Sequence, residues 1–184
     1  MSFLSALQFL TILPVRLNFD KKQIQNSLLF FPIVGALIGL LLFTADFLLA
    51  SPVISVVILI VITGGLHLDG LADIFDGIGG GHGKPGAILK IMADSRTGTF
   101  GLLAIISVIL LKIEMLSSLT YLMPAGLLIM PVLSRWCMVF AVSFFNYAKK
   151  TGSAKVFFEG RKIYSFAFTS LFAAGYSFAI MKLA

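Results

Sequence analysis

Long uncharged stretches alternate with short polar segments along this chain, which is the pattern of a protein that crosses a membrane several times. Residues 115–147 contain one charge, Arg135, and predict either a broken pair of helices or one helix with a re-entrant lead-in. We expect an all-α, polytopic integral membrane protein in which about five helices cross the bilayer within a single domain, residues 1–184. The other four predicted crossings contain no charged residue and are residues 23–45, 47–66, 97–111 and 163–181.

Two smaller features refine this pattern. In residues 1–14, Ser2, Ser5, Gln8 and Thr11 recur at every third position of an otherwise apolar segment, which predicts a short interfacial helix that ends before Pro14. In the first crossing, Gly35 and Gly39 lie one helical turn apart. Such a face of small residues predicts the close approach of another helix.

Composition and charge agree with the membrane assignment. The chain is 59% hydrophobic and 12% charged, and its mean hydropathy of +1.03 excludes an ordinary soluble domain. The net charge of +6 comes from basic residues that gather in segments 16–22, 84–96 and 149–162. The positive-inside rule makes these segments cytoplasmic. We therefore expect an inner-membrane protein whose partner is the lipid bilayer, with no nucleic-acid partner.

Half of the eight acidic residues lie between His67 and Gly101. On a helix, Asp69, Asp73 and Asp76 would share one face, because they are spaced at i, i+4 and i+7. Three carboxylates so close repel one another unless a divalent cation neutralises them. Oxygen ligands suit Mg²⁺, Mn²⁺ or Ca²⁺, and Mg²⁺ usually completes its shell with water and substrate phosphate. These aspartates therefore predict a metal site and a phosphate-bearing substrate.

The segment after the aspartates contains candidate phosphate ligands. Its glycine-rich part, residues 77–86, is expected to end the helix and to expose backbone N–H groups that can wrap an anion. Lysine and arginine side chains and hydroxyl groups follow within two turns. Carboxylates, a glycine loop and cations in one loop are typical of phosphoryl transfer. The predicted phosphate-binding residues here are Gly79, Gly80, Gly81, Lys90 and Ser95.

Several of these residues have a second interpretation. Asp94 would either take part in catalysis or pair with Lys90 one turn away. Arg96 would either anchor the chain at the interface or hold a phosphate through its planar fork, which we favour. The general base is predicted to be Asp94 or His82. Arg135, inside an apolar stretch, must find a partner, and we favour an aspartate or a substrate phosphate over snorkelling to the membrane surface. His67 is as compatible with a capping role as with that of a base.

Five segments together resemble the cobalamin synthase family, the adenosylcobinamide-GDP ribazoletransferases. The most specific are HLDGLADIFDGIGGG at 67–81 and IMADSRTGTFG at 91–101. The weaker ones are FLTILPV at 9–15, FFPIVGALIG at 30–39 and LSRWCMVFAVSFFNYAKKTG at 133–152. All five occur in the order in which the family has them.

The resemblance implies a Mg²⁺-dependent transferase that joins adenosylcobinamide-GDP to α-ribazole or its 5′-phosphate and releases GMP. It leaves open whether the chain forms a homo-oligomer or associates with other cobalamin-assembly enzymes. The chain departs from the family pattern at Asn146, where proline is expected, at Ser153 and Ala154, where Leu-Gly is expected, and in a shorter C-terminal end. Two other classes are weighed beside it: a phospholipid-type alcohol phosphotransferase and a non-catalytic transporter or scaffold subunit.

Overall fold

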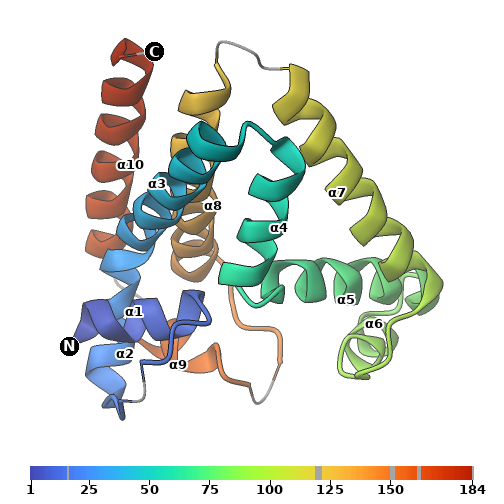
Figure 1. Cartoon of the computed structure of the whole chain (residues 1–184). Coiled ribbons are helices and arrows are strands. Elements are labelled where there is room, and N and C mark those ends of the chain that lie inside the picture. Colours follow the sequence, from blue (N-terminus) through green and yellow to red (C-terminus); the bar gives the residue numbers. More distant parts are fainter. Residues whose placement is uncertain (16, 119–121, 150–151, 161–162, 184) are drawn as a thin grey trace.

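The protein is a set of helices without a strand among the residues that the computed structural model describes, which are 1–15, 17–118, 122–149, 152–160 and 163–183 (Figure 1). Three long helices run roughly side by side, and shorter helices cover one end of them. The helices are α1 (Ser2–Leu10), α2 (Lys21–Asn26), η1 (Ser27–Phe30), α3 (Phe31–Leu49), α4 (Pro52–Ile62), α5 (Leu66–Gly81), α6 (Pro85–Ile91), α7 (Thr99–Ser118), α8 (Met123–Phe144), α9 (Lys155–Glu159) and α10 (Ile163–Leu183).

The long helices α3, α8 and α10 form the packed part of the structure. A Cβ atom built on Gly39 would lie 2.8 Å from the carbonyl oxygen of Leu128, and one built on Gly35 would meet Pro131. These two glycines therefore let α3 and α8 approach closely, as the sequence predicted. On its other side α8 meets α10, where the indole Nε1 of Trp136 donates to the Ser170 hydroxyl at 2.9 Å.

Four continuous helical stretches, Lys21–Leu49, Thr99–Ser118, Met123–Phe144 and Ile163–Leu183, are long and apolar enough to cross a membrane. This confirms the polytopic all-α prediction. Within residues 115–147, residues 115–118 end α7, and Met123–Phe144 form one unbroken helix, α8, with Pro131 inside it, so the predicted pair of helices does not form there. Residues 119–121, where a re-entrant lead-in would begin, lie outside the described residues. The third crossing was expected to end at Lys112. It continues to Ser118, so Lys112 lies within α7.

The second crossing does not form the single helix that the apolar run of residues 47–66 predicted. α4 has 11 residues, which cover only about 16 Å. The chain then turns by 87° into α5. Gly64 and Gly65 make this turn with φ values of +62° and +68°, a region that few other residues enter. Figure 1 shows α5 running across the direction of α3, α8 and α10.

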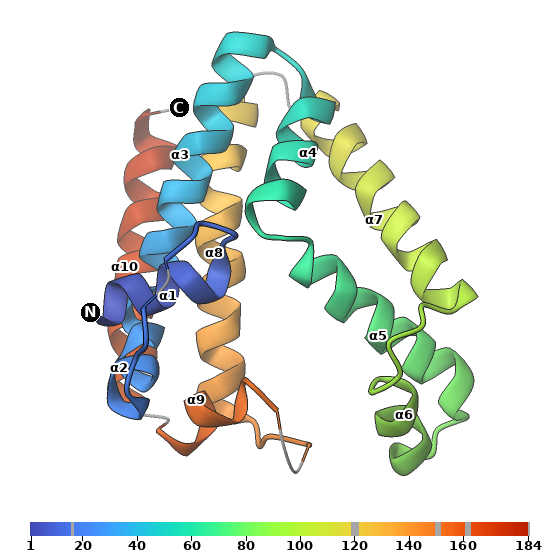
Figure 2. The same cartoon turned by 60° about the horizontal axis from the view of Figure 1, so that its bottom comes forward.

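The N-terminal segment forms the predicted helix, α1, which ends at Leu10. Its Phe9 ring stacks on Phe31 of α3 with centroids 5.9 Å apart, and it meets the Phe157 ring of α9 at 4.9 Å. Figure 2 shows that α1, α2 and α9 lie together at one end of the bundle, away from α5 and α6. Aromatic packing therefore joins the start of the chain to the segment before the last helix.

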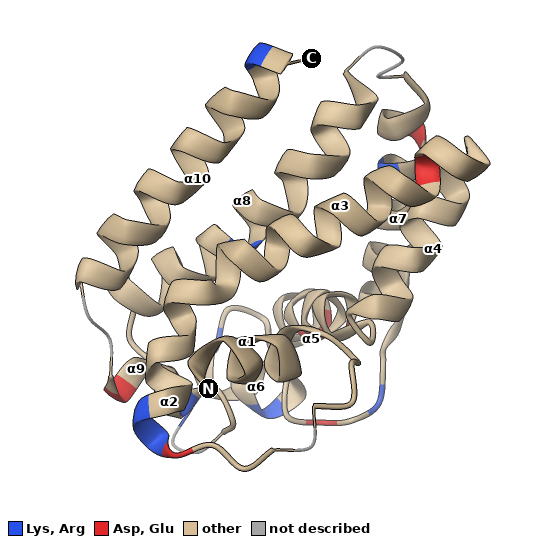
Figure 3. Cartoon of the chain, turned by 60° about the vertical axis from the view of Figure 1, so that its left-hand side comes forward, with Lys and Arg blue, Asp and Glu red and all other residues tan. Residues whose placement is uncertain are grey.

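Charged residues are concentrated at one end of the molecule. In Figure 3 much of the lysine and arginine lies at the end that carries α2, α6 and α9, whereas the long helices are largely uncharged. Lys21 of α2 and Glu159 of α9 form an ion pair of 2.8 Å there. Arg16, Lys150, Arg161 and Lys162, which contributed to the predicted basic loops, lie outside the described residues.

Candidate active site

The three clustered aspartates lie on one helix, α5, as their spacing predicted. Asp69 is exposed, and Asp73 and Asp76 are half-buried. α5 lies outside the four continuous spans. Burial and the negative charge of Asp69 raise the pKa of Asp73. A cation placed beside Asp69 and Asp73 would relieve this repulsion.

Asp76 already has two partners in the structure. Its carboxylate accepts the backbone N–H of Gly98 at 2.7 Å and that of Gly101 at 2.8 Å. Gly98 directly precedes α7 and Gly101 lies in its first turn, where backbone N–H groups have no partner within the helix. A carboxylate there also complements the positive end of the helix dipole. Asp76 therefore fixes the start of α7 on α5, a role that the sequence did not predict.

The predicted metal site can be compared with the positions of these carboxylates. Among the described residues, no group of three His, Cys, Asp or Glu side chains is placed to hold a metal ion together. Mg²⁺ needs only one or two protein carboxylates when a substrate phosphate and water supply the rest. Asp69 and Asp73 fit that requirement, since no hydrogen bond to another described residue occupies them. The assignment of Asp69, Asp73 and Asp76 to a metal stays a prediction.

The glycine loop expected after Asp76 is absent from the described structure, because α5 continues through Gly79 and Gly80 to Gly81. Within the helix the N–H groups of these glycines donate to carbonyl groups of α5. Added Cβ atoms would clash with the Phe100 ring at Gly79 and with Ile88 at Gly81. The glycines thus allow α6 and the start of α7 to pack on α5. They do not form the loop on which their predicted phosphate-binding role depended.

His82 ends α5 in the left-handed conformation, with φ at +46°. It is exposed and lies one helix away from Lys90, which is exposed in the last turn of α6. Ser95 is exposed in the turn that follows. All three predicted site residues therefore lie at the surface in the segment that connects α5 with α7, where a substrate can reach them.

Asp94 pairs with Arg96 and not with Lys90, the partner considered from the sequence. The Arg96 guanidinium donates to both carboxylate oxygens, at 3.1 Å from Nε and 2.7 Å from a terminal nitrogen. These hydrogen bonds hold the pKa of Asp94 at about 2. A carboxylate so acidic is a poor general base at neutral pH. Arg96 remains 88% exposed, so its outer face can contact a substrate phosphate.

Lys149 joins this region from a distant part of the chain. Its ammonium group donates to the Met92 carbonyl oxygen at 3.4 Å, and its charge acts on Asp73 in the direction opposite to that of Asp69. From the sequence, Lys149 was predicted only as part of the basic segment 149–162. No local spacing could have revealed this contact, because it arises from the packing of the segment after α8 against the segment after α6.

Arg135 and His67 lie in a different place from the aspartates. Both line a cavity of about 680 Å³ that also contains Lys112, and the aspartates of α5 are absent from its described lining. Arg135 donates to the Ser134 hydroxyl at 2.8 Å, and the His67 Nδ1 lies 3.0 Å from the Thr63 hydroxyl. Arg135 has no aspartate partner among the described residues. A substrate phosphate, the other partner considered for it, stays a prediction.

Comparisons with known proteins place the chain in a family. Residues 2–184 match the family described as Cobalamin-5-phosphate synthase. The chain belongs to this family. No solved structure was found to match it. Membership of the family therefore rests on the sequence match alone. This match confirms the resemblance that the motifs of α5 and of the segment after it indicated.

Three relatives are named adenosylcobinamide-GDP ribazoletransferase. The relative from Clostridium tetani is 33% identical over 93% of this chain and 72% of its own length. That from Desulforamulus reducens is 39% identical over 80% of this chain and 62% of its own length. That from Stutzerimonas stutzeri is 43% identical over 72% of this chain and 58% of its own length. The chain thus spans roughly two thirds of the length of the relatives it matches.

Proposed function

We propose that the chain is a Mg²⁺-dependent transferase that joins adenosylcobinamide-GDP to α-ribazole, or to its 5′-phosphate, with release of GMP. The observation that carries this proposal is that the charge of Lys149 acts on Asp73, which with Asp69 leaves two carboxylates of α5 free of hydrogen bonds to other described residues. Arg96, in the segment between α6 and α7, remains largely exposed. Free carboxylates and basic side chains suit a metal and a diphosphate together. The names of the relatives support the choice of substrate.

In the proposed reaction a ribose hydroxyl oxygen of the acceptor forms a bond to the phosphorus on the cobinamide side of the diphosphate. The bond from that phosphorus to the GMP oxygen breaks, GMP leaves with the electron pair, and the hydroxyl proton passes to a base. A bound Mg²⁺ ion would neutralise charge on the diphosphate. The predicted site residues have separate roles in this transfer: metal binding, phosphate binding and proton removal.

Asp69 and Asp73 are assigned to hold the ion. Arg96 and Lys90 are assigned to the phosphate oxygens, where the planar fork of arginine stabilises the charge that develops during transfer. Asp94 acts as a positioning residue because its two oxygens fix the Arg96 guanidinium. We favour His82 over Asp94 as the base, since the pKa of Asp94 is about 2.

The other two classes are less compatible with these residues. A phospholipid-type alcohol phosphotransferase carries an arginine directly after its DGxxA element. If that element began at Asp69, this chain would have Asp73 in place of the alanine and Ile74 in place of the arginine. A transporter would need acidic groups that face one another within the spans. Here the aspartates lie on α5, which runs across the bundle (Figure 1).

The proposed orientation in the cell membrane follows from the positions of the basic residues. The end that carries α2, α6 and α9 (Figure 3) is proposed to face the cytoplasm, with α5 near the membrane surface. In this orientation α7 runs outward from Thr99 and α8 returns from Met123. The proposed site is then accessible to cytoplasmic nucleotides.

The test is acceptor-dependent release of GMP. Membranes that contain the chain are incubated with adenosylcobinamide-GDP and Mg²⁺, with or without α-ribazole, and GMP is measured by chromatography. We expect GMP only when acceptor and Mg²⁺ are both present, and a rate lower by about 100-fold or more with Asp73→Asn. Equal GMP without acceptor would identify a hydrolase, and no GMP under any condition would contradict the proposal.

A further inference from the structure

The larger of the two cavities described carries three basic groups, and none of the α5 aspartates is in its described lining. His67 comes from the start of α5, Lys112 from α7 and Arg135 from α8. The remaining lining is mainly apolar and consists of Phe9, Leu10, Leu59, Thr63, Leu66, Met130, Pro131, Ser134, Met138 and Ser153.

Lys112 and Arg135 lie within spans and have no carboxylate partner in the part of the chain that the structure describes. Arg135 is near the middle of the 22-residue helix α8, and Lys112 is in the second half of the 20-residue helix α7. Both side chains are half-buried, and their charges act on each other and on His67. The two ion pairs found among the described residues, Lys21–Glu159 and Arg96–Asp94, include neither of them. Like charges at such depth are costly unless an anion joins them.

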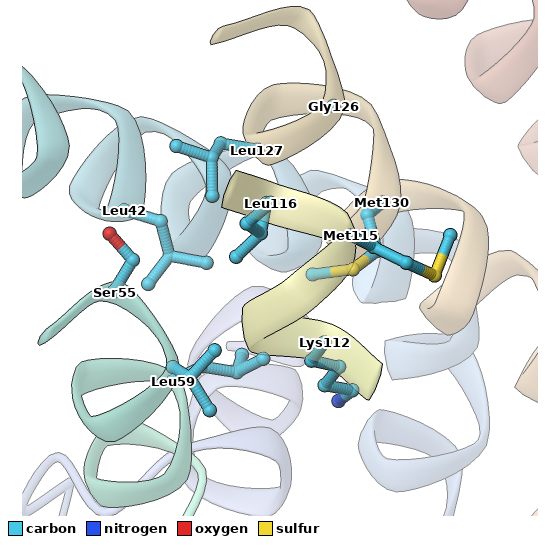
Figure 4. Close-up of a pocket in the computed structure, with 10 residues that line it drawn as sticks. Leu42, Ser55, Leu59, Lys112, Met115, Leu116, Gly126, Leu127 and Met130 are labelled. Carbon is cyan, nitrogen blue, oxygen red and sulfur yellow. The ribbon is translucent and has the colours of Figure 1, made fainter. Parts of the chain in front are cut away.

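Lys112 also borders a second, smaller cavity of about 210 Å³. Leu59, Lys112 and Met130 line both cavities, so the two spaces are neighbours. Figure 4 shows Lys112 at the end of the smaller cavity nearest Leu59, with Met115 and Met130 beside it. The apolar lining continues past the cations into the smaller cavity. A ligand could therefore place an anionic group at the cations and its apolar part against this lining.

We propose that the cavity between α4, α5, α7 and α8 is a second anion site, in which Lys112 and Arg135 hold a phosphate group of a ligand whose remainder is apolar or aromatic. Its volume is within the range of small-molecule sites. Two kinds of ligand could supply the phosphate group. One is the 5′-phosphate of the acceptor nucleotide, which rests on the proposed function, and the other is the head group of an anionic phospholipid.

The experiment measures binding without turnover. The protein is purified in a zwitterionic detergent with EDTA, so that the aspartate face holds no metal, and calorimetry compares α-ribazole with α-ribazole 5′-phosphate. We expect the phosphorylated form to bind about 10- to 100-fold more tightly. Lys112→Gln and Arg135→Gln should each remove most of this difference. Lys182→Gln, an exposed lysine at the end of α10, and Asp73→Asn should preserve it.

A lipid arm distinguishes the two sources. Native mass spectrometry compares the phospholipid that remains on the wild type with that on Lys112→Gln and Arg135→Gln. If both nucleoside forms bind equally, and an anionic phospholipid is retained by the wild type but lost from both variants, the site holds a head group. If neither the phosphate preference nor lipid retention depends on Lys112 and Arg135, the proposal is wrong.

Two further measurements keep the result interpretable. Removing one of two like charges should leave the unfolding temperature of the ligand-free protein unchanged or raise it, and Arg135→Lys should recover part of the phosphate preference because it keeps the charge. Release of GMP is assayed on the same preparation. Absence of GMP from the wild type would contradict the proposed transfer, whereas the anion site is judged by binding alone.

Discussion

Replacing Asp76 by alanine should loosen the start of α7, whereas the same change at Asp69 should not. The Asp76 carboxylate accepts the N–H groups of Gly98 and Gly101, at 2.7 and 2.8 Å. A hydrogen bond to a charged group contributes about 1.5–3 kcal/mol. Because the bond to Gly98 is exposed, we expect a loss of about 2–4 kcal/mol from the two bonds together. Asp69 accepts no hydrogen bond from another described residue.

Hydrogen–deuterium exchange in detergent micelles measures this effect locally. If the start of α7 opens as a unit, a loss of this size speeds exchange at residues 98–102 by about 30- to 1000-fold in Asp76→Ala. Asp76→Asn keeps one acceptor oxygen and should fall between the alanine variant and the wild type. Asp69→Ala is the matched control on the same helix face. Equal exchange in Asp76→Ala and Asp69→Ala would refute the capping role of Asp76.

Three other predictions concern separate parts of the structure. Arg96→Lys should bind adenosylcobinamide-GDP within about tenfold of the wild type but lower kcat by about 100-fold or more; unchanged kcat would leave Arg96 an interfacial anchor. In a Cys137→Ser background, an impermeant thiol reagent should label Leu122→Cys but not Lys84→Cys in intact cells; the reverse would invert the topology. Gly39→Val should cost about 1–3 kcal/mol of stability, because its side chain meets the Leu128 carbonyl; a thermal melt equal to that of Gly175→Ala, which meets no atom, would contradict this.

The spacing of residues along the sequence predicted those helices for which the local preference of the residues and their packing in the fold favour the same structure. The aspartate face of α5 follows from spacing alone, and the contact of α3 with α8 follows from Gly35 and Gly39. The end of α5 could not be predicted in this way. Glycine disfavours helix, but the space that Gly79 and Gly81 leave for Phe100 and Ile88 outweighs that preference.

The remaining errors have similar physical causes. The apolar run through residues 47–66 concealed a bend, although Gly64 and Gly65 supplied a local signal for it. Lys112 was interpreted as the end of a crossing because charge usually marks the membrane surface. In the structure a cavity receives its side chain, so α7 continues beyond it. The contact of Lys149 with Met92 depends on tertiary packing that spacing does not encode.

Product analysis tests the proposed transfer most directly. The purified chain is supplied with adenosylcobinamide-GDP, α-ribazole and Mg²⁺, and mass spectrometry quantifies both the joined cobamide and GMP. The account predicts that the two products appear in equal amounts, that EDTA abolishes both, and that Asp69→Asn and Asp73→Asn each lower their rate by about 100-fold or more. GMP without cobamide, or undiminished cobamide formation by both aspartate variants, would contradict it.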